Sequence, residues 1–67
     1  MKYYIECSSV RSDYYIQIDG RYSLGRMIQQ GFDYINRTDR YSRFRIVAGY
    51  SLATVKPITS YFEKEPS

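Results

Sequence analysis

Two short segments in which apolar and polar residues alternate constrain the fold more than any other feature of this sequence. Their apolar sides carry Tyr3, Ile5 and Cys7 within residues 2–8, and Tyr14, Ile16 and Ile18 within residues 13–19. A repeat of two residues is typical of a strand with one buried face. The polar segment 8–12 between them predicts a hairpin, and Asp19-Gly20 then ends the second strand with a turn.

A short helix is predicted over residues 23–30. Ser23 has the side chain of an N-cap, and Gly31 stands where a left-handed residue would end the helix. The apolar residues between them are spaced to lie on one side of that helix: Leu24, Met27 and Ile28. We expect these three side chains to dock the helix on the sheet.

The following region, residues 32–48, allows two interpretations. In the first, residues 32–36 and 43–48 are strands joined by a loop. In the second, a helix covers residues 33–47, with an apolar side made of Tyr34, Tyr41, Phe44 and Val47. The first is preferred because Arg43-Phe44-Arg45-Ile46 alternates with a period of two, and because the helical stripe has no apolar member between Ile35 and Tyr41.

Pro57 predicts that the last segment, residues 53–58, is an edge strand, since proline lacks the N–H that a central strand must donate. These elements together predict an α+β fold of order β-β-α-β-β. It would consist of a single antiparallel sheet of about four to five strands, with one short helix packed on one face. Residues 1–62 are expected to form one compact domain, and residues 63–67 a disordered tail.

The small size of the chain limits how it can be stabilised. A domain of about 60 residues buries only about 60% of the surface of its unfolded chain, and usually gains support from disulfides, a structural metal or a partner subunit. With 67 residues, Cys7 as the only cysteine and no histidine, an internal disulfide is impossible and we expect no metal or other cofactor. Support from another protein, or from a homodimer, is therefore expected.

Catalytic groups are scarce. There is no histidine to act as a general base, and Cys7 lies on the predicted core face. The candidate carboxylates occupy positions typical of turns or of strand ends: Asp13, Asp19, Asp33 and Asp39. No glycine-rich phosphate loop follows a strand. The sequence therefore predicts a protein that is not an enzyme.

The composition also bears on the cellular setting. No apolar stretch approaches the ~18 residues of a membrane span, and Glu6 interrupts the amino-terminal segment before the apolar region of a signal peptide could develop. A single cysteine agrees with a reducing compartment. We therefore expect a cytoplasmic protein that does not contact membranes.

The predominance of arginine among the cations indicates a binding role. Arginine supplies seven of the ten cations in a chain of net charge +3, and there are nine tyrosines, more than a small core can bury with every hydroxyl satisfied. Arginine and tyrosine are the side chains that most often anchor interfaces. If the helix covers one face of the sheet, the open face and the loop beside it present the candidate partner-binding residues: Tyr4, Tyr15, Arg43 and Arg45 on the face, and Arg37 and Arg40 in the loop.

The leading hypothesis is a small, basic, non-enzymatic protein-binding module. It looks like the inhibitors and regulators that phages and mobile elements encode, and its arginine- and tyrosine-rich face would bind an acidic or nucleic-acid-binding surface of a partner protein. A first alternative is direct binding of single-stranded nucleic acid, in which bases stack on the tyrosine rings and guanidinium groups contact phosphates. A second is a structural subunit that self-associates through a sheet edge. In the competing explanation, these side chains only keep an ordinary sheet face hydrated.

Overall fold

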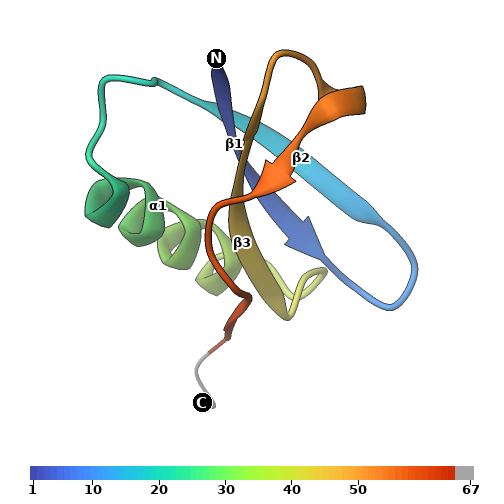
Figure 1. The fold of residues 1–67 in the computed structure, drawn as a ribbon. Coiled ribbons are helices and arrows are strands. Elements are labelled where there is room, and N and C mark those ends of the chain that lie inside the picture. Colours follow the sequence, from blue (N-terminus) through green and yellow to red (C-terminus); the bar gives the residue numbers. More distant parts are fainter. Residues whose placement is uncertain (65–67) are drawn as a thin grey trace.

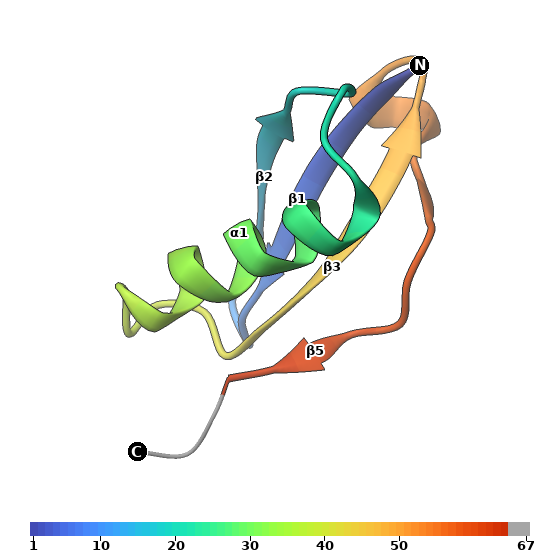
Figure 2. The ribbon, with the colours of Figure 1, turned by 90° about the vertical axis from the view of Figure 1, so that its left-hand side faces the viewer.

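A computed structural model of the protein describes residues 1–64. Its elements are the strands β1 (Lys2–Ser8) and β2 (Asp13–Ile18), the helix α1 (Leu24–Asn36), the strand β3 (Arg43–Gly49), the 3-10 helix η1 (Leu52–Thr54) and the short strands β4 (Lys56–Pro57) and β5 (Phe62–Glu63). The antiparallel sheet has the order β2-β1-β3-β4, and β5 also pairs with β3. Because α1 packs on one face of this sheet (Figures 1 and 2), the predicted α+β fold is confirmed.

The predicted hairpin is formed by β1 and β2, with Ile5 opposite Ile16. Its turn is held by Ser9, whose hydroxyl oxygen accepts hydrogen bonds from the backbone N–H groups of Arg11 at 3.2 Å and Ser12 at 3.3 Å. A serine that bonds its own turn thus replaces the Asn-Gly signal that the sequence lacks. Since β1 also pairs with β3, it is an interior strand of the sheet.

The helix begins as predicted and ends later. The Ser23 hydroxyl oxygen accepts a hydrogen bond of 3.2 Å from the N–H of Arg26, which confirms the N-cap. The helix then continues to Asn36, so the predicted end at residue 30 and the predicted strand over residues 32–36 are both wrong. The alternative helix over residues 33–47 is also wrong, because β3 begins at Arg43.

The helix continues past its predicted end at residue 30 because of a contact at Gly31. This residue does not have the positive φ of a helix-ending glycine and lies buried within α1. A Cβ atom added there would lie 2.1 Å from Cε2 of Phe44. Glycine therefore lets the Phe44 ring pack against the helix backbone, and a pattern of residue types alone cannot distinguish this role from a helix cap.

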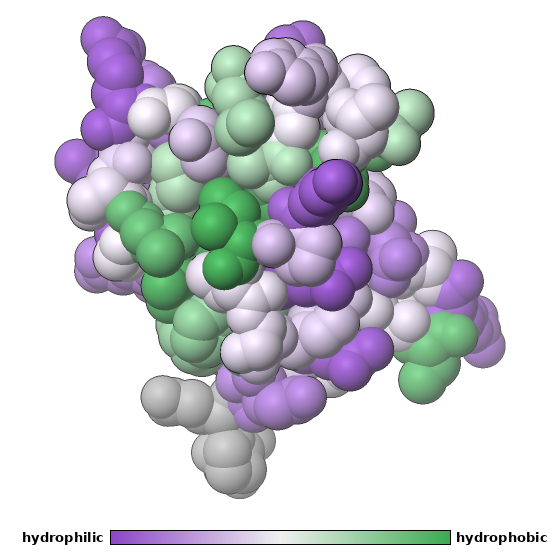
Figure 3. All heavy atoms as spheres, viewed as in Figure 1, coloured by the Kyte–Doolittle hydropathy of each residue, from purple (hydrophilic) through white to green (hydrophobic). Residues whose placement is uncertain are grey.

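The core lies between α1 and the sheet. Cys7, Ile35, Phe44 and Ile46 are fully buried, which confirms Cys7 as a core residue. Met27 is buried with them, but Leu24 is 45% exposed, so the prediction that Leu24 docks the helix is wrong. Figure 3 shows apolar side chains gathered on this side of the molecule, over α1 and the neighbouring carboxy-terminal segment.

The carboxy-terminal segment runs along β3. Pro57 lies in the short edge strand β4, as predicted, whereas residues 53 and 54 belong to η1 rather than to a strand. Glu63 lies in β5, and the N–H of Lys64 donates a 2.7 Å hydrogen bond to the carbonyl oxygen of Ser42. The ordered chain therefore reaches beyond residue 62, and residues 65–67 of the predicted tail lie outside the described residues.

Candidate functional site

The sheet face opposite α1 is centred on a buried carboxylate, Glu6. Its side chain is only 4% exposed, and Oε1 accepts a 2.6 Å hydrogen bond from Nε of Arg45. The strand register produces this contact, because Glu6 lies directly opposite Arg45 on β3 and directly opposite Tyr15 on β2. Cross-strand neighbours of this kind are the closest side-chain pairs in an antiparallel sheet.

Two tyrosine hydroxyls complete the environment of Glu6. Tyr15 donates to Oε2 at 2.8 Å and Tyr61 donates to Oε1 at 2.7 Å. Burial by itself raises the pKa of Glu6, but the hydrogen bonds from Arg45, Tyr61 and Tyr15 outweigh it and hold that pKa below its ordinary value. The hydrogen bond to Glu6 in turn raises the pKa of Tyr15 to about 12. At neutral pH, Glu6 is therefore an anion surrounded by donors.

Tyr61 also covers the two arginines predicted on this face. The guanidinium carbon of Arg43 lies 4.0 Å from the centre of the Tyr61 ring, and that of Arg45 lies 4.5 Å from it. At these distances a cation is attracted to the face of the ring. The expected open, basic face is thus partly covered by the carboxy-terminal segment, and the charge of Arg45 is balanced by Glu6.

The predicted tyrosines of this face serve the same packing. Tyr4 and Tyr15 do pair across the outer face, with ring centres 6.4 Å apart and planes at 89°. Tyr4, however, is only 6% exposed, so most of its ring is not accessible to a partner. Of the four residues predicted on the open face, only Arg43 is exposed.

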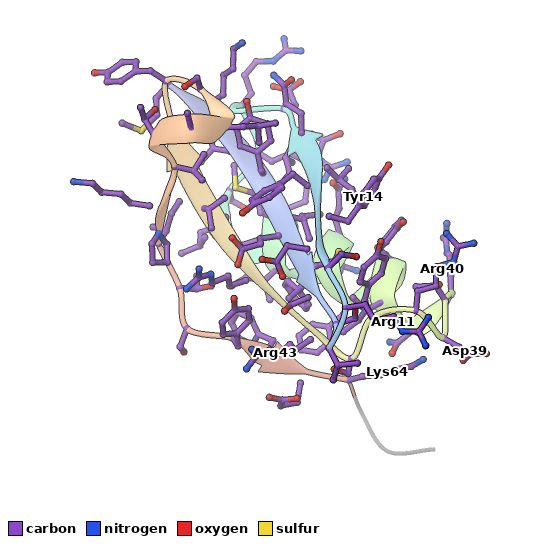
Figure 4. All side chains as sticks on the ribbon, turned by 90° about the vertical axis from the view of Figure 1, so that its right-hand side faces the viewer. Arg11, Tyr14, Asp39, Arg40, Arg43 and Lys64 are labelled. Atoms are coloured by element: carbon purple, nitrogen blue, oxygen red, sulfur yellow. The ribbon has the colours of Figure 1, made fainter. Side chains whose placement is uncertain are left out.

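The predicted loop arginines lie elsewhere, at the end of the molecule formed by the turn 9–12 and the loop 37–42, here called the hairpin end. Arg37 caps the carboxyl end of α1, and both Arg37 and Arg40 are exposed. Asp39, which lies between them in the loop, pairs with Lys64 at 3.6 Å. Figure 4 shows Asp39, Arg40 and Lys64 at this end, together with Arg11.

Three tyrosines that the sequence did not single out as a site meet at the hairpin end. Tyr14 comes from β2, Tyr34 from α1 and Tyr41 from the loop before β3, and their ring centres lie 6.0 to 6.4 Å apart. The Tyr14 ring is within 18° of parallel to each of the other two. Tyr14 is 49% exposed, and within residues 1–64 no hydrogen bond engages any of the three hydroxyls.

Two hollows flank this cluster. One, of about 370 Å³, is lined by Arg11, Arg40 and Tyr41 with the turn residues Ser9 and Ser12. The other, of about 280 Å³, lies between α1 and β2 and is lined by Ile5, Ile16, Gln30, Asp33, Tyr34 and Arg37. The ion pairs among the described residues leave Arg11, Arg37 and Arg40 without an acidic partner. The hairpin end therefore combines tyrosine rings with three arginines that form no ion pair among the described residues.

The sequence held a partial signal for this cluster. Tyr14 was predicted to face the helix side, which is correct, but Tyr34 was placed in a strand because the helix was predicted to end too early. With α1 extended to residue 36, Tyr34 falls on the helix side of the sheet beside Tyr14. Glu6 gave a clearer signal, since it lies on the same outward face as Arg45, but only the pairing of β1 with β3 brings them together.

Among residues 1–64, no group of three His, Cys, Asp or Glu side chains gathers to hold a metal ion, and no helix is long and apolar enough to cross a membrane. Burial raises the pKa of the Cys7 thiol to about 11, so it is protonated and shielded at neutral pH. Comparison of the chain with protein-family models, with curated proteins and with solved structures found no significant match.

Proposed function

We propose that this protein is a small, non-enzymatic, cytoplasmic binding module that contacts an acidic surface of a partner protein. Its contact residues are Tyr14, Tyr34 and Tyr41 with Arg37 and Arg40, here called the tyrosine–arginine surface. Binding would block or regulate the partner, in the manner of the short inhibitors that phages and mobile elements encode.

The observation that carries this proposal is the meeting of three tyrosine rings with arginines that have no acidic partner among the described residues. The rings come from three different elements and pack on one another, so each loses little conformational freedom when a partner covers it. Tyrosine and arginine are enriched among the residues that contribute most to protein interfaces. Arg40 and Arg37 would add charge-assisted contacts to carboxylates.

Within the proposal, the sheet-face residues have a supporting role. Tyr15 and Arg45 hydrogen-bond Glu6 from β2 and β3, and Tyr4 packs on Tyr15, which keeps these strands at a fixed spacing. Arg43 remains exposed and would extend the positive potential of the hairpin end toward the partner.

Capture of partners from host lysate, identified by mass spectrometry, tests the proposal. The immobilised protein should retain one or more proteins that the double variant Arg37→Glu, Arg40→Glu loses. The matched control is Lys2→Glu, Lys56→Glu, which makes the same change in net charge at two exposed lysines away from the hairpin end. Equal losses in both double variants, or no loss in either, would contradict the proposed surface.

The same variants address the nucleic-acid alternative, for which the tyrosine rings are also suited as a stacking platform. A labelled single-stranded oligonucleotide is titrated at low and at moderate salt. Direct nucleic-acid binding predicts an affinity that falls with salt with a log-log slope of about −0.7 per contacted phosphate, and that falls again in Arg37→Glu, Arg40→Glu. Such a result would replace the protein-binding proposal, and absence of binding at low salt would eliminate the alternative.

A further inference from the structure

The two edges of the sheet differ in a way that points to a second binding mode. One edge is formed by the short strand β4, where Pro57 and Lys56 discourage further pairing. The opposite edge is β2, six residues long, with the sequence Asp-Tyr-Tyr-Ile-Gln-Ile and neither proline nor lysine. Proteins usually protect a long, apolar edge strand, because its free backbone groups pair with any strand that fits.

The backbone groups that β2 leaves free follow from the hydrogen bonds around it. The N–H of Ser9 donates to the carbonyl oxygen of Ser12 at 3.1 Å, so these two residues form a hydrogen-bonded pair. Such pairs alternate along an antiparallel ladder, which makes Cys7–Tyr14 and Ile5–Ile16 the next hydrogen-bonded pairs. The N–H and C=O groups of the intervening residues of β2 therefore point away from β1, toward the free edge: Asp13, Tyr15 and Gln17.

The same alternation is supported from the far side of the sheet. The N–H of Ile58 donates to the carbonyl oxygen of Ile46 at 2.8 Å, so the backbone groups of Ile46 point away from β1. Ile5, which lies opposite Ile46, must then direct its own backbone groups toward β2. The hydrogen bonds on both sides of β1 therefore give the same set of free backbone groups in β2.

We propose that β2 pairs with β2 of a second copy of this chain, antiparallel and around a twofold axis, with Tyr15 opposite Tyr15 of the second copy. Asp13 would then lie opposite Gln17 of the second copy, and Gln17 opposite its Asp13. In this register all three residues with free backbone groups are hydrogen-bonded across the interface. The two sheets would join into one continuous sheet with both α1 helices on the same side.

Charge separates this register from one of its two neighbours; the other, with Tyr14 opposite Tyr14, sets Gln17 opposite the turn residue Arg11 rather than opposite a strand residue. With Tyr15 opposite Tyr15, the exposed Arg11 in the turn lies beside the ion pair that Asp19 and Arg21 of the second copy form at 2.9 Å, so this register sets no two carboxylates opposite each other. A shift that places Ile16 opposite Ile16 would also satisfy the backbone, but it would set Asp13 opposite Asp19 of the second copy and Arg11 near Arg21 of the second copy. Like charges directly opposite one another destabilise strand pairs, so the first register is favoured.

The helix side of β2 has apolar surface that this pairing would cover. α1 packs mainly against β3 and β1, which leaves Tyr14 half exposed and Ile16 partly exposed at the edge. In the proposed register Tyr14 of the second copy lies beside Ile16, which lines the hollow of about 280 Å³ between β2 and α1. The interface would therefore bury apolar side chains as well as pair backbone groups, which suits a small domain with a small core.

This inference does not depend on the proposed partner surface. The pairing uses the edge of β2 and covers part of Tyr14, whereas Tyr41, Arg37 and Arg40 lie in or next to the loop before β3. If both hold, Tyr41, Arg37 and Arg40 of each copy remain for the partner, and a partner with two acidic sites would gain from bivalent contact.

Disulfide trapping tests the register directly. Tyr15→Cys should form a covalent dimer on mild oxidation, because Cα atoms of directly opposed residues lie about 5.5 Å apart, within the range that a disulfide spans. Gln17→Cys alone is the matched control, since the two copies of residue 17 would lie about 13 Å apart along the sheet, beyond that range. Cys7 is fully buried and does not interfere.

A second variant covers the case in which Tyr15→Cys disturbs the contacts of Glu6. Asp13→Cys combined with Gln17→Cys places two opposed cysteine pairs in the proposed interface without touching that network, and should also give covalent dimers. Sedimentation of the wild type should give twice the mass of one chain. A wild-type monomer at high micromolar concentration, or efficient trapping of Gln17→Cys alone, would overturn the proposal; no lysate or partner enters the measurement.

Discussion

Glu6 and Arg45 face each other across the pairing of β1 with β3, with Nε of Arg45 donating a 2.6 Å hydrogen bond to Oε1 of Glu6. The Glu6 side chain is almost fully buried, while the Arg45 side chain is 28% exposed. The pair is thus anchored inside the sheet and open at one side. It balances the charge of Arg45 on the face that the sequence predicted to be open and basic, and leaves Arg43 as the exposed cation there.

Replacing Glu6 with glutamine should lower the free energy of unfolding by about 2 kcal/mol, because a buried donor amide then meets three donors and Arg45 loses its counter-charge. Chemical denaturation monitored by circular dichroism measures the change. Asp19→Asn is the control, since the Asp19–Arg21 pair lies at the surface and should have no measurable effect. A similar loss in both variants would contradict the assigned role of Glu6.

Protonation of Glu6 in acid should also lower the free energy of unfolding. Because the pKa of Glu6 in the folded protein lies below its ordinary value of 4.5, the unfolded chain binds a proton more readily than the folded one. The stabilising contribution is therefore fully present above about pH 4.5 and is lost as the pH falls through the folded-state pKa. Denaturation curves between neutral pH and pH 3 give the free energy of unfolding, which should fall less steeply with decreasing pH in Glu6→Gln than in the wild type. An equally steep fall in both would assign the acid effect to other carboxylates.

Two glycines in the same helix should respond in opposite ways to alanine. Gly31→Ala should destabilise the protein by about 1 to 3 kcal/mol, since the added Cβ would collide with the Phe44 ring and force a shift in a packed core. Gly25→Ala meets no atom within 4 Å and should stabilise by up to about 1 kcal/mol through helix propensity. Thermal unfolding of both variants measures the contrast. Stabilisation by Gly31→Ala would show that the ring does not need the glycine.

Two substitutions at Tyr61 should separate the contribution of its hydroxyl to stability from that of its ring. Tyr61→Phe removes one hydrogen bond to Glu6 and should cost about 1 kcal/mol of unfolding free energy. Tyr61→Ala also removes the ring that covers Arg43 and Arg45, and should cost at least about 1 kcal/mol more. Denaturant titration of the two variants gives both values. If the phenylalanine and alanine variants were equally stable, the ring would not hold the carboxy-terminal segment on the sheet.

Local patterns predicted much of the framework. The alternation in residues 2–8 and 13–19 specified β1, β2 and the hairpin, because a strand with one buried face shows its period directly in the sequence. The N-cap at Ser23 and the edge position of Pro57 were predictable for a similar reason, since each depends on backbone hydrogen bonds within a few residues.

The candidate site was less predictable because its parts are far apart in the chain. The sequence placed Tyr4, Tyr15, Arg43 and Arg45 on one face correctly, but their exposure depends on Tyr61, which reaches Glu6 from 55 residues away. The tyrosines at the hairpin end likewise come from three elements that only the docking of α1 brings together.

By itself, the sequence determined that residues 2–8 and 13–18 form strands and that the helix begins after Ser23, since these depend on the period of apolar residues and on local hydrogen bonds. The tertiary structure decided where the helix ends, because Gly31 serves the Phe44 ring rather than a cap. It also decided which arginines remain available. Arg45 is neutralised by a glutamate that strand order places beside it, whereas Arg37 and Arg40 lie near a loop with no acidic partner among the described residues.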